Sequence, residues 1–257
     1  MHTDTVDLKR LGRIDIQDLT IINEYLGREF LPFPLIPTLP NRFTYFDEYA
    51  AHARSVPDRF NHGDLVVFKK WFTSLAEADL RVECRVQYYA ADIPAQRMLA
   101  HRTGQLGFLA LQGADDVVDV FTLSPYDLGP AIAGSVDMTR PGARPAVVIS
   151  EYVPQTVLEV ADESGADQPW AAASPVTVSS AEVRAYATVQ SHRLPARDWG
   201  VDQERNAVVF VRLVDDGDYA YVPGYSCAKP VSRQDLRQRI DQLIADDVAV
   251  LRQSRDL

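Results

Sequence analysis

The chain has 257 residues, 46% of them hydrophobic, so it can bury a sizeable core and is not intrinsically disordered. Its 26 basic and 36 acidic residues leave a formal net charge of −10, which argues against nucleic acid and anionic membranes as partners. No apolar run approaches the roughly 18 residues of a membrane helix, and the charged N-terminus lacks a signal-peptide core. We therefore expect a cytosolic protein in which Cys84 and Cys227 stay reduced and serve as packing residues.

The N-terminal part is predicted to be mainly helical. A short strand at Arg13–Ile16 precedes a helix at Asp18–Leu26, and two further helices are expected at Tyr45–Arg54 and Leu65–Glu77. Between them, the stretch Leu31–Pro40 carries four prolines, which exclude a helix or a central strand. Its apolar side chains indicate that it packs against the protein rather than acting as a linker.

Strands follow the helices. Apolar residues alternate with polar ones from Asp79 to Tyr89, which predicts a strand with one buried and one polar face. Three more strands are predicted at Arg97–Arg102, Gly107–Gln112 and Val117–Leu123, and the short turns between them favour an antiparallel meander. A helix at about Tyr126–Ala133 closes this block.

The second half begins after a connector at Arg140–Pro145 that contains prolines and a glycine. An extended segment at Ala146–Ile149, a helix at Pro154–Asp162 and a loop to Pro175 are expected next. The last element is a long helix that starts at Ser232, where Asp235 completes a near capping box. Its apolar residues recur at helical spacing up to Leu251.

An internal repeat links the two halves. Leu80–Gln87 aligns with Val183–Gln190, sharing Arg, Val and Gln residues and the same alternation. Further matches follow in the same order: Pro94-Ala95 with Pro195-Ala196, Phe108–Leu111 with Val208–Val211, and Asp115-Asp116 with Asp215-Asp216. Alone, Val183–His192 also fits an amphipathic helix, and the alignment is what favours a strand. We predict one domain over 1–257, made of halves at about 1–140 and 146–257.

No motif indicates catalysis. The five histidines form no spaced metal-ligand set, and the 13 glycines form no phosphate-binding loop, so no metal and no cofactor are expected. The segment Gly224–Ala228 loosely resembles a nucleophile elbow around Ser226, but Pro230 delays the following helix and no histidine follows His192. We predict that the chain is not an enzyme; a serine hydrolase and a small-ligand-binding protein remain the alternatives.

The order of features resembles the EspG family of type VII secretion chaperones. The resemblance is carried by Leu31–Leu35 after the early helix, Arg97–Ala100 followed by Gly107–Ala110, Pro141-Gly142, and Asp216–Tyr219 before the terminal helix. It implies an α+β fold with a pseudo-twofold duplicated unit, in which helical bundles flank a central antiparallel β-sheet. It also implies a cytosolic chaperone that binds the helical tip of a PE–PPE heterodimer and keeps it soluble for secretion. Neither nucleic acid nor membrane insertion is expected, and weak homodimer formation stays open.

The resemblance places the protein-binding surface on the sheet, the terminal helical region and the loop Tyr89–Ile93. Tyr89 and Tyr186 are the strongest single candidates, because aromatic residues concentrate binding energy at the centres of interfaces. The full set of expected contact residues is Arg81, Arg85, Gln87, Tyr89, Asp92, Tyr186, Thr188 and Gln190.

Overall fold

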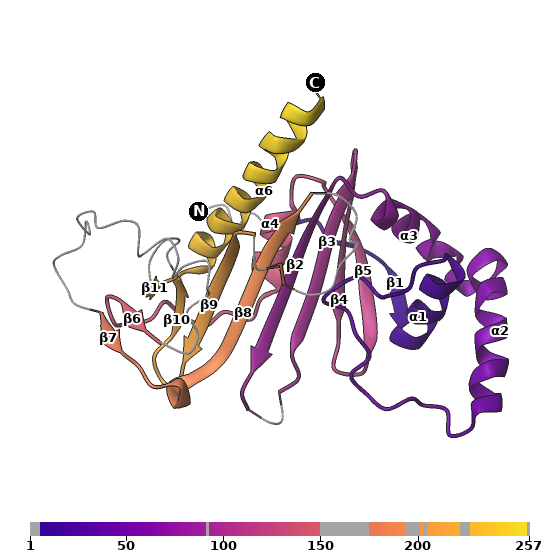
Figure 1. Ribbon diagram of the computed structural model, residues 1–257, viewed down its shortest axis with the longest axis horizontal. Helices are drawn as coiled ribbons and strands as arrows, with labels where there is room; N and C mark the ends of the chain where they lie inside the picture. Colours follow the sequence, from indigo (N-terminus) through magenta and orange to yellow (C-terminus); the bar gives the residue numbers. More distant parts are fainter. Residues whose placement is uncertain are drawn as a thin grey trace.

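The computed structural model describes residues 6–90, 93–149, 175–193, 201–202, 205–221 and 227–255. Within these residues it has an α+β architecture, in which five α-helices pack on a single 11-stranded sheet. Figure 1 shows the sheet running across the molecule, with α1, α2 and α3 gathered at one end and α6 crossing the other half.

The N-terminal half follows the predicted order of elements. Its elements are β1 (Lys9–Asp15), α1 (Ile16–Tyr25), α2 (Phe46–His62), η1 (Asp64–Phe68), α3 (Lys69–Ala76), β2 (Leu80–Tyr88), β3 (Gln96–Thr103), β4 (Leu106–Gln112), β5 (Val117–Leu123) and α4 (Leu128–Ser135). The prediction ended the second helix at Arg54, before Pro57. Helix α2 instead continues to His62, because Val56 and Phe60 are buried in the core and their burial offsets the hydrogen bond that proline cannot donate.

The C-terminal half confirms that the segment 183–192 is a strand. Its elements are β6 (Val147–Val148), β7 (Val176–Thr177), η3 (Ser180–Glu182), β8 (Val183–His192), β9 (Ala207–Leu213), β10 (Asp218–Tyr221), β11 (Ala228–Pro230) and α6 (Arg233–Arg255). Ser179 caps only the single turn η3, after which the chain enters the sheet. The helix predicted at Pro154–Asp162 lies outside the described residues, as do Asp92 and Ser226.

The strand order is the same on both sides of the sheet's centre. Strand β2 lies beside β8, and the order continues outward as β3, β4, β5, β1 on one side and β9, β10, β11, β6 on the other. The β2–β8 register places Arg85 opposite Thr188, which are equivalent residues in the octamer alignment. Strand β7 lies at one edge and pairs with β6 in parallel. The sheet is therefore mixed, whereas the prediction was an antiparallel sheet.

The later part of the repeat alignment does not fit this order. Val208–Val211 lies in β9, next to the central pair, whereas Phe108–Leu111 lies in β4, one strand farther out. Likewise, Asp215-Asp216 precedes β10, whereas Asp115-Asp116 precedes β5. Short apolar strands resemble one another in sequence, so the alignment matched β9 with β4. The pairing of the strands shows instead that β3 is the counterpart of β9.

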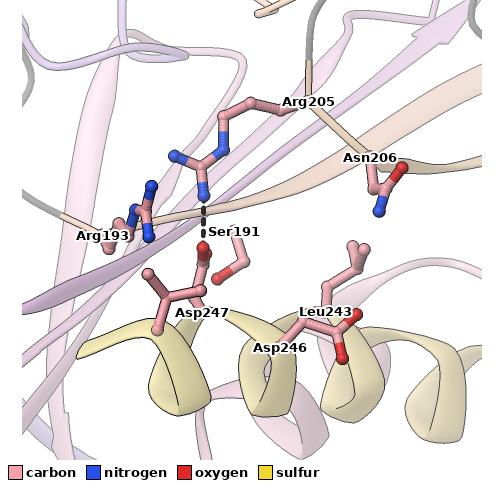
Figure 2. Close-up of a pocket in the computed structure, with 8 residues that line it drawn as sticks. Ser191, Arg193, Arg205, Asn206, Leu243, Asp246 and Asp247 are labelled. Carbon is pink, nitrogen blue, oxygen red and sulfur yellow. Dashed lines mark hydrogen bonds and ion pairs between the residues drawn. The ribbon is translucent and has the colours of Figure 1, made fainter. Parts of the chain in front are cut away.

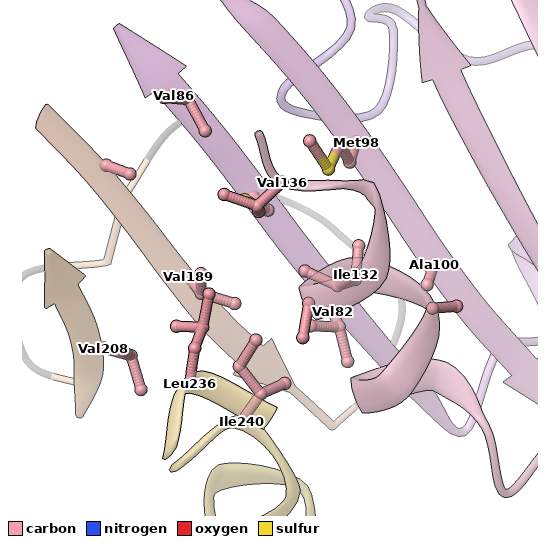
Figure 3. Packing of buried hydrophobic residues seen from close by; sticks show 14 of the residues in the cluster. Val82, Val86, Met98, Ala100, Ile132, Val136, Val189, Val208, Leu236 and Ile240 are labelled. Atoms are coloured by element: carbon pink, nitrogen blue, oxygen red, sulfur yellow. The ribbon is translucent and has the colours of Figure 1, made fainter. Parts of the chain in front are cut away.

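Helices α4 and α6 cover one face of the central strands. Their apolar side chains, including Ile132 on α4 and Leu236 and Ile240 on α6, are fully buried against the sheet (Figure 3). On the opposite face, α1 to α3 cover β1, β5, β4 and β3, while a separate apolar cluster spans β9, β10 and β6. Between these two clusters, β2 and β8 present polar side chains.

One aspartate in each half ties a threonine segment to the sheet. The Asp116 carboxylate accepts hydrogen bonds from the backbone N–H of Thr38 at 2.7 Å and from its hydroxyl at 2.5 Å. The Asp218 carboxylate accepts from the N–H and hydroxyl of Thr139 at 2.7 and 3.2 Å. The first of these contacts holds the proline-rich stretch against the protein, as its apolar composition predicted.

Candidate functional site

The central polar strip is the polar face of the two middle strands. It consists of the odd-numbered residues of β2 from Arg81 to Gln87 and the even-numbered residues of β8 from Tyr186 to Gln190. Because alternate side chains of a strand point to opposite faces, these residues share the face that α4 and α6 leave free. Six of the eight residues predicted to bind a partner lie in this strip.

Two of those six side chains are buried within the chain. Arg81 donates from Nε to Glu83 Oε1 at 3.1 Å, and His192 Nε2 lies 3.2 Å from the other Glu83 oxygen. Gln190 donates to the carbonyl oxygen of Asp202 at 2.6 Å and accepts from its N–H at 2.8 Å. Contacts within the chain therefore occupy this end of the strip, and the buried side chains of Arg81 and Gln190 are not accessible to a partner.

The other end of the strip is accessible. Arg85, Gln87, Tyr186 and Thr188 are partly buried. Arg85 donates from Nη2 to Gln87 Oε1 at 3.0 Å, and Tyr186 packs against the apolar cluster of β9 and β10. Tyr89, just beyond the end of β2, is 49% exposed. This end presents hydrogen-bonding groups, a cation and two aromatic rings to an incoming surface.

Arg97 is a further residue of this face that the sequence analysis did not identify. It lies on β3 directly opposite Arg85 and is only 8% exposed. The available signal was the hairpin between β2 and β3, since its register determines which residues face one another. The alternation pattern predicts both strands but leaves their register open.

A pocket of about 320 Å³ lies between the end of β8, the start of β9 and the C-terminal half of α6 (Figure 2). An ion pair between Arg205 and Asp247 crosses it. Ser191 Oγ and the second carboxylate oxygen of Asp247 are buried and have no hydrogen-bond partner among the described residues. Buried polar groups without partners are uncommon in folded proteins. These two oxygens are therefore candidates to accept hydrogen bonds from a bound molecule.

A serine–histidine pair occurs in the core but lacks the chemistry of a catalytic dyad. Ser74 Oγ lies 2.8 Å from His101 Nε2 and donates its own proton to the Trp71 carbonyl oxygen at 2.9 Å. The imidazole therefore donates to the serine, whereas a catalytic base must accept the serine proton. His101 is also fully buried, and its Nδ1 has no partner among the described residues.

Among the described residues, no group of three or more His, Cys, Asp or Glu residues is arranged to hold a metal ion. The helices of the same residues include none that is long and apolar enough to cross a membrane.

The comparisons with known proteins identify a family. Residues 15–242 match the model of the EspG family, which spans nearly the whole chain. A comparison with curated proteins found no match.

Proposed function

This chain belongs to the EspG family of type VII secretion-associated proteins, and on that premise we propose that it is a cytosolic chaperone for helical PE–PPE substrates. Family membership assigns a secretion-related role, and the single structural observation that supports substrate binding is the accessible end of the central polar strip. A chaperone of this kind binds the helical tip of a PE–PPE heterodimer and keeps its apolar end out of water until secretion.

The proposed contact surface combines the accessible end of the strip with the loop after β2. Partly buried residues of this kind lose little conformational freedom on binding, and aromatic side chains supply most of the contact energy. The residues that we assign to it are Arg85, Gln87, Tyr89, Tyr186 and Thr188, together with Asp92, which lies outside the described residues.

We also propose that the two halves arose from one duplicated unit. The mirrored strand order about β2 and β8, and the pairing of Arg85 with its aligned counterpart Thr188, support this history. The pseudo-twofold axis would then pass through the middle of the central polar strip. The surface at this axis is formed by equivalent strands, one from each half. The helices at the two ends of the sheet differ, so the whole molecule is asymmetric.

Co-expression tests the proposed function. The chain should co-elute in size-exclusion chromatography with a PE–PPE pair encoded near its own gene, and failure to co-elute with any such pair would refute the proposal. The Tyr89→Ala and Tyr186→Ala variants should weaken the complex. Tyr126→Ala is the matched control, because Tyr126 is 74% exposed and precedes α4, away from the strip. Thermal unfolding of each free variant separates lost binding from lost folding, and the same column measures self-association.

The pocket of Figure 2 favours small-ligand binding as a second candidate function. Ser191 and Asp247 line it, and one side-chain oxygen of each is buried without a hydrogen-bond partner among the described residues. A screen of amino acids and nucleotides would support this function if one compound raised the melting temperature of the wild type but not that of Ser191→Val. A hydrolase would instead show esterase activity that Ser226→Ala abolishes.

A further inference from the structure

Two arginines stand side by side on the polar face of the sheet. The antiparallel register of β2 and β3 places Arg85 directly opposite Arg97. Like charges at directly opposed positions destabilise a sheet, and the repulsion grows where burial lowers the local dielectric. Burial lowers the pKa of Arg97 below its usual value and the nearby Arg85 charge adds to the lowering, whereas Asp116 opposes it.

No carboxylate among the described residues pairs with either guanidinium. The neighbouring arginines on the same strands do have acidic partners, since Arg81 contacts Glu83 and Arg102 contacts Asp79, each at 3.1 Å. Glu83 points to the same face as Arg85, but its oxygens face Arg81 and His192.

Neutral groups around the two arginines accept only part of the hydrogen bonds that their guanidinium groups can donate. Arg85 donates to the Gln87 side chain at 3.0 Å, and Arg97 donates from Nη1 to the Ala95 carbonyl oxygen at 3.2 Å. The Nε–H groups of both arginines are buried without a hydrogen-bond partner in the part of the chain that the structure describes. Asp116, the acid that acts on Arg97, is already bonded to Thr38 and Gln112.

We propose that Arg85 and Arg97 together bind a carboxylate, supplied by an aspartate or glutamate side chain of the helical protein partner. This inference rests on the proposed function. A carboxylate accepts two parallel N–H bonds from a guanidinium, so one such group between the two arginines removes both their repulsion and their missing acceptors. Because the chain carries a net charge of −10, this local positive site would also select where an acidic partner docks.

Neutralising the arginines one at a time tests the inference. Arg85→Gln and Arg97→Gln should each leave the melting temperature of the free chain unchanged or raised, because each removes a repulsion. Each should weaken the PE–PPE complex about tenfold or more in a titration by calorimetry. Arg54→Gln is the matched control, since Arg54 is exposed on α2 and its Nε donates to the Ala50 carbonyl oxygen of the same helix.

Two results would overturn the inference: affinities of both variants equal to that of Arg54→Gln, or a free chain that both variants destabilise. Arg85→Lys provides a further check, because it keeps the charge but loses the fork-shaped donor set. Its affinity should fall between those of the wild type and Arg85→Gln.

Sulfate provides a readout that needs no partner. Replacing chloride by sulfate at equal ionic strength should raise the melting temperature of the wild type and of Arg54→Gln more than that of Arg85→Gln. Equal increases in all three proteins would refute an anion site. If sulfate stabilises selectively but no PE–PPE pair binds the wild type, the proposed function fails and the anion site stands. If complexes form with unchanged affinity in the arginine variants, the partner carboxylate is refuted.

Discussion

The buried His101 makes the stability of this chain depend on pH. Its imidazole is fully buried, stacks on Phe108 with ring centroids 5.2 Å apart, and lies opposite Arg81 in the β2–β3 register. Burial, aided by the Arg81 charge, lowers the pKa of His101 from 6.5 to about 3. The folded chain therefore keeps this histidine neutral at pH values where the unfolded chain protonates it.

The sign and size of the effect follow from proton linkage. Above about pH 6.5 both states are neutral at this residue and the full stability is present, whereas below it the unfolded state gains the proton first. The free energy of unfolding should fall by about 1.4 kcal/mol per pH unit between roughly pH 6.5 and pH 3. At about pH 5 the loss is about 2 kcal/mol, before most carboxylates titrate.

Urea denaturation at about pH 7.5 and about pH 5 measures this loss. His101→Gln retains a donor for Ser74 and removes the titrating group, so its stability should change much less between the two pH values. His62→Gln, at an exposed position on α2, is the control and should behave as the wild type. An equal loss in the wild type and His101→Gln would show that other groups cause the pH dependence.

Three further predictions concern the core. Asp218→Ala should lower the free energy of unfolding by about 3–5 kcal/mol in urea, because it removes the buried carboxylate 2.7 Å from the Arg212 guanidinium and leaves only the exposed Asp137 carboxylate, 3.7 Å away. A loss below 1 kcal/mol, roughly that of a surface pair, would contradict this. Ile240→Ala should lower the free energy of unfolding by about 2–5 kcal/mol in the same assay, because Ile240 is fully buried. Ala249→Gly, at an exposed position of α6, is the control for effects on the helix without loss of core packing. Burial raises the pKa of the Cys84 thiol to about 12, so a thiol reagent should label Cys84 only in urea, and rapid native labelling would refute its burial.

The partner-binding surface was predictable in part from the sequence. Alternation along Leu80–Gln87 identified Arg85 and Gln87 as residues of one face, because the strand period is two. Alternation does not reveal what covers that face. Gln190 has the same pattern as Thr188, yet its side chain is buried and hydrogen-bonded to the backbone of Asp202. Contacts between residues distant in sequence decide such differences.

The amino-acid sequence by itself determined the order and type of most described helices and of the long strands, although not of the short strands β7 and β11, together with the packing of the proline-rich stretch and the family. These features depend on local periodicity, on proline geometry and on short motifs that neighbouring residues carry. Only the tertiary structure decided how strands pair, and with that the mirrored order about β2 and β8 and the place of β9 beside the centre. The opposition of Arg85 and Arg97 has the same origin, because register depends on hydrogen bonds between strands and a shift of one residue would move a side chain to the other face.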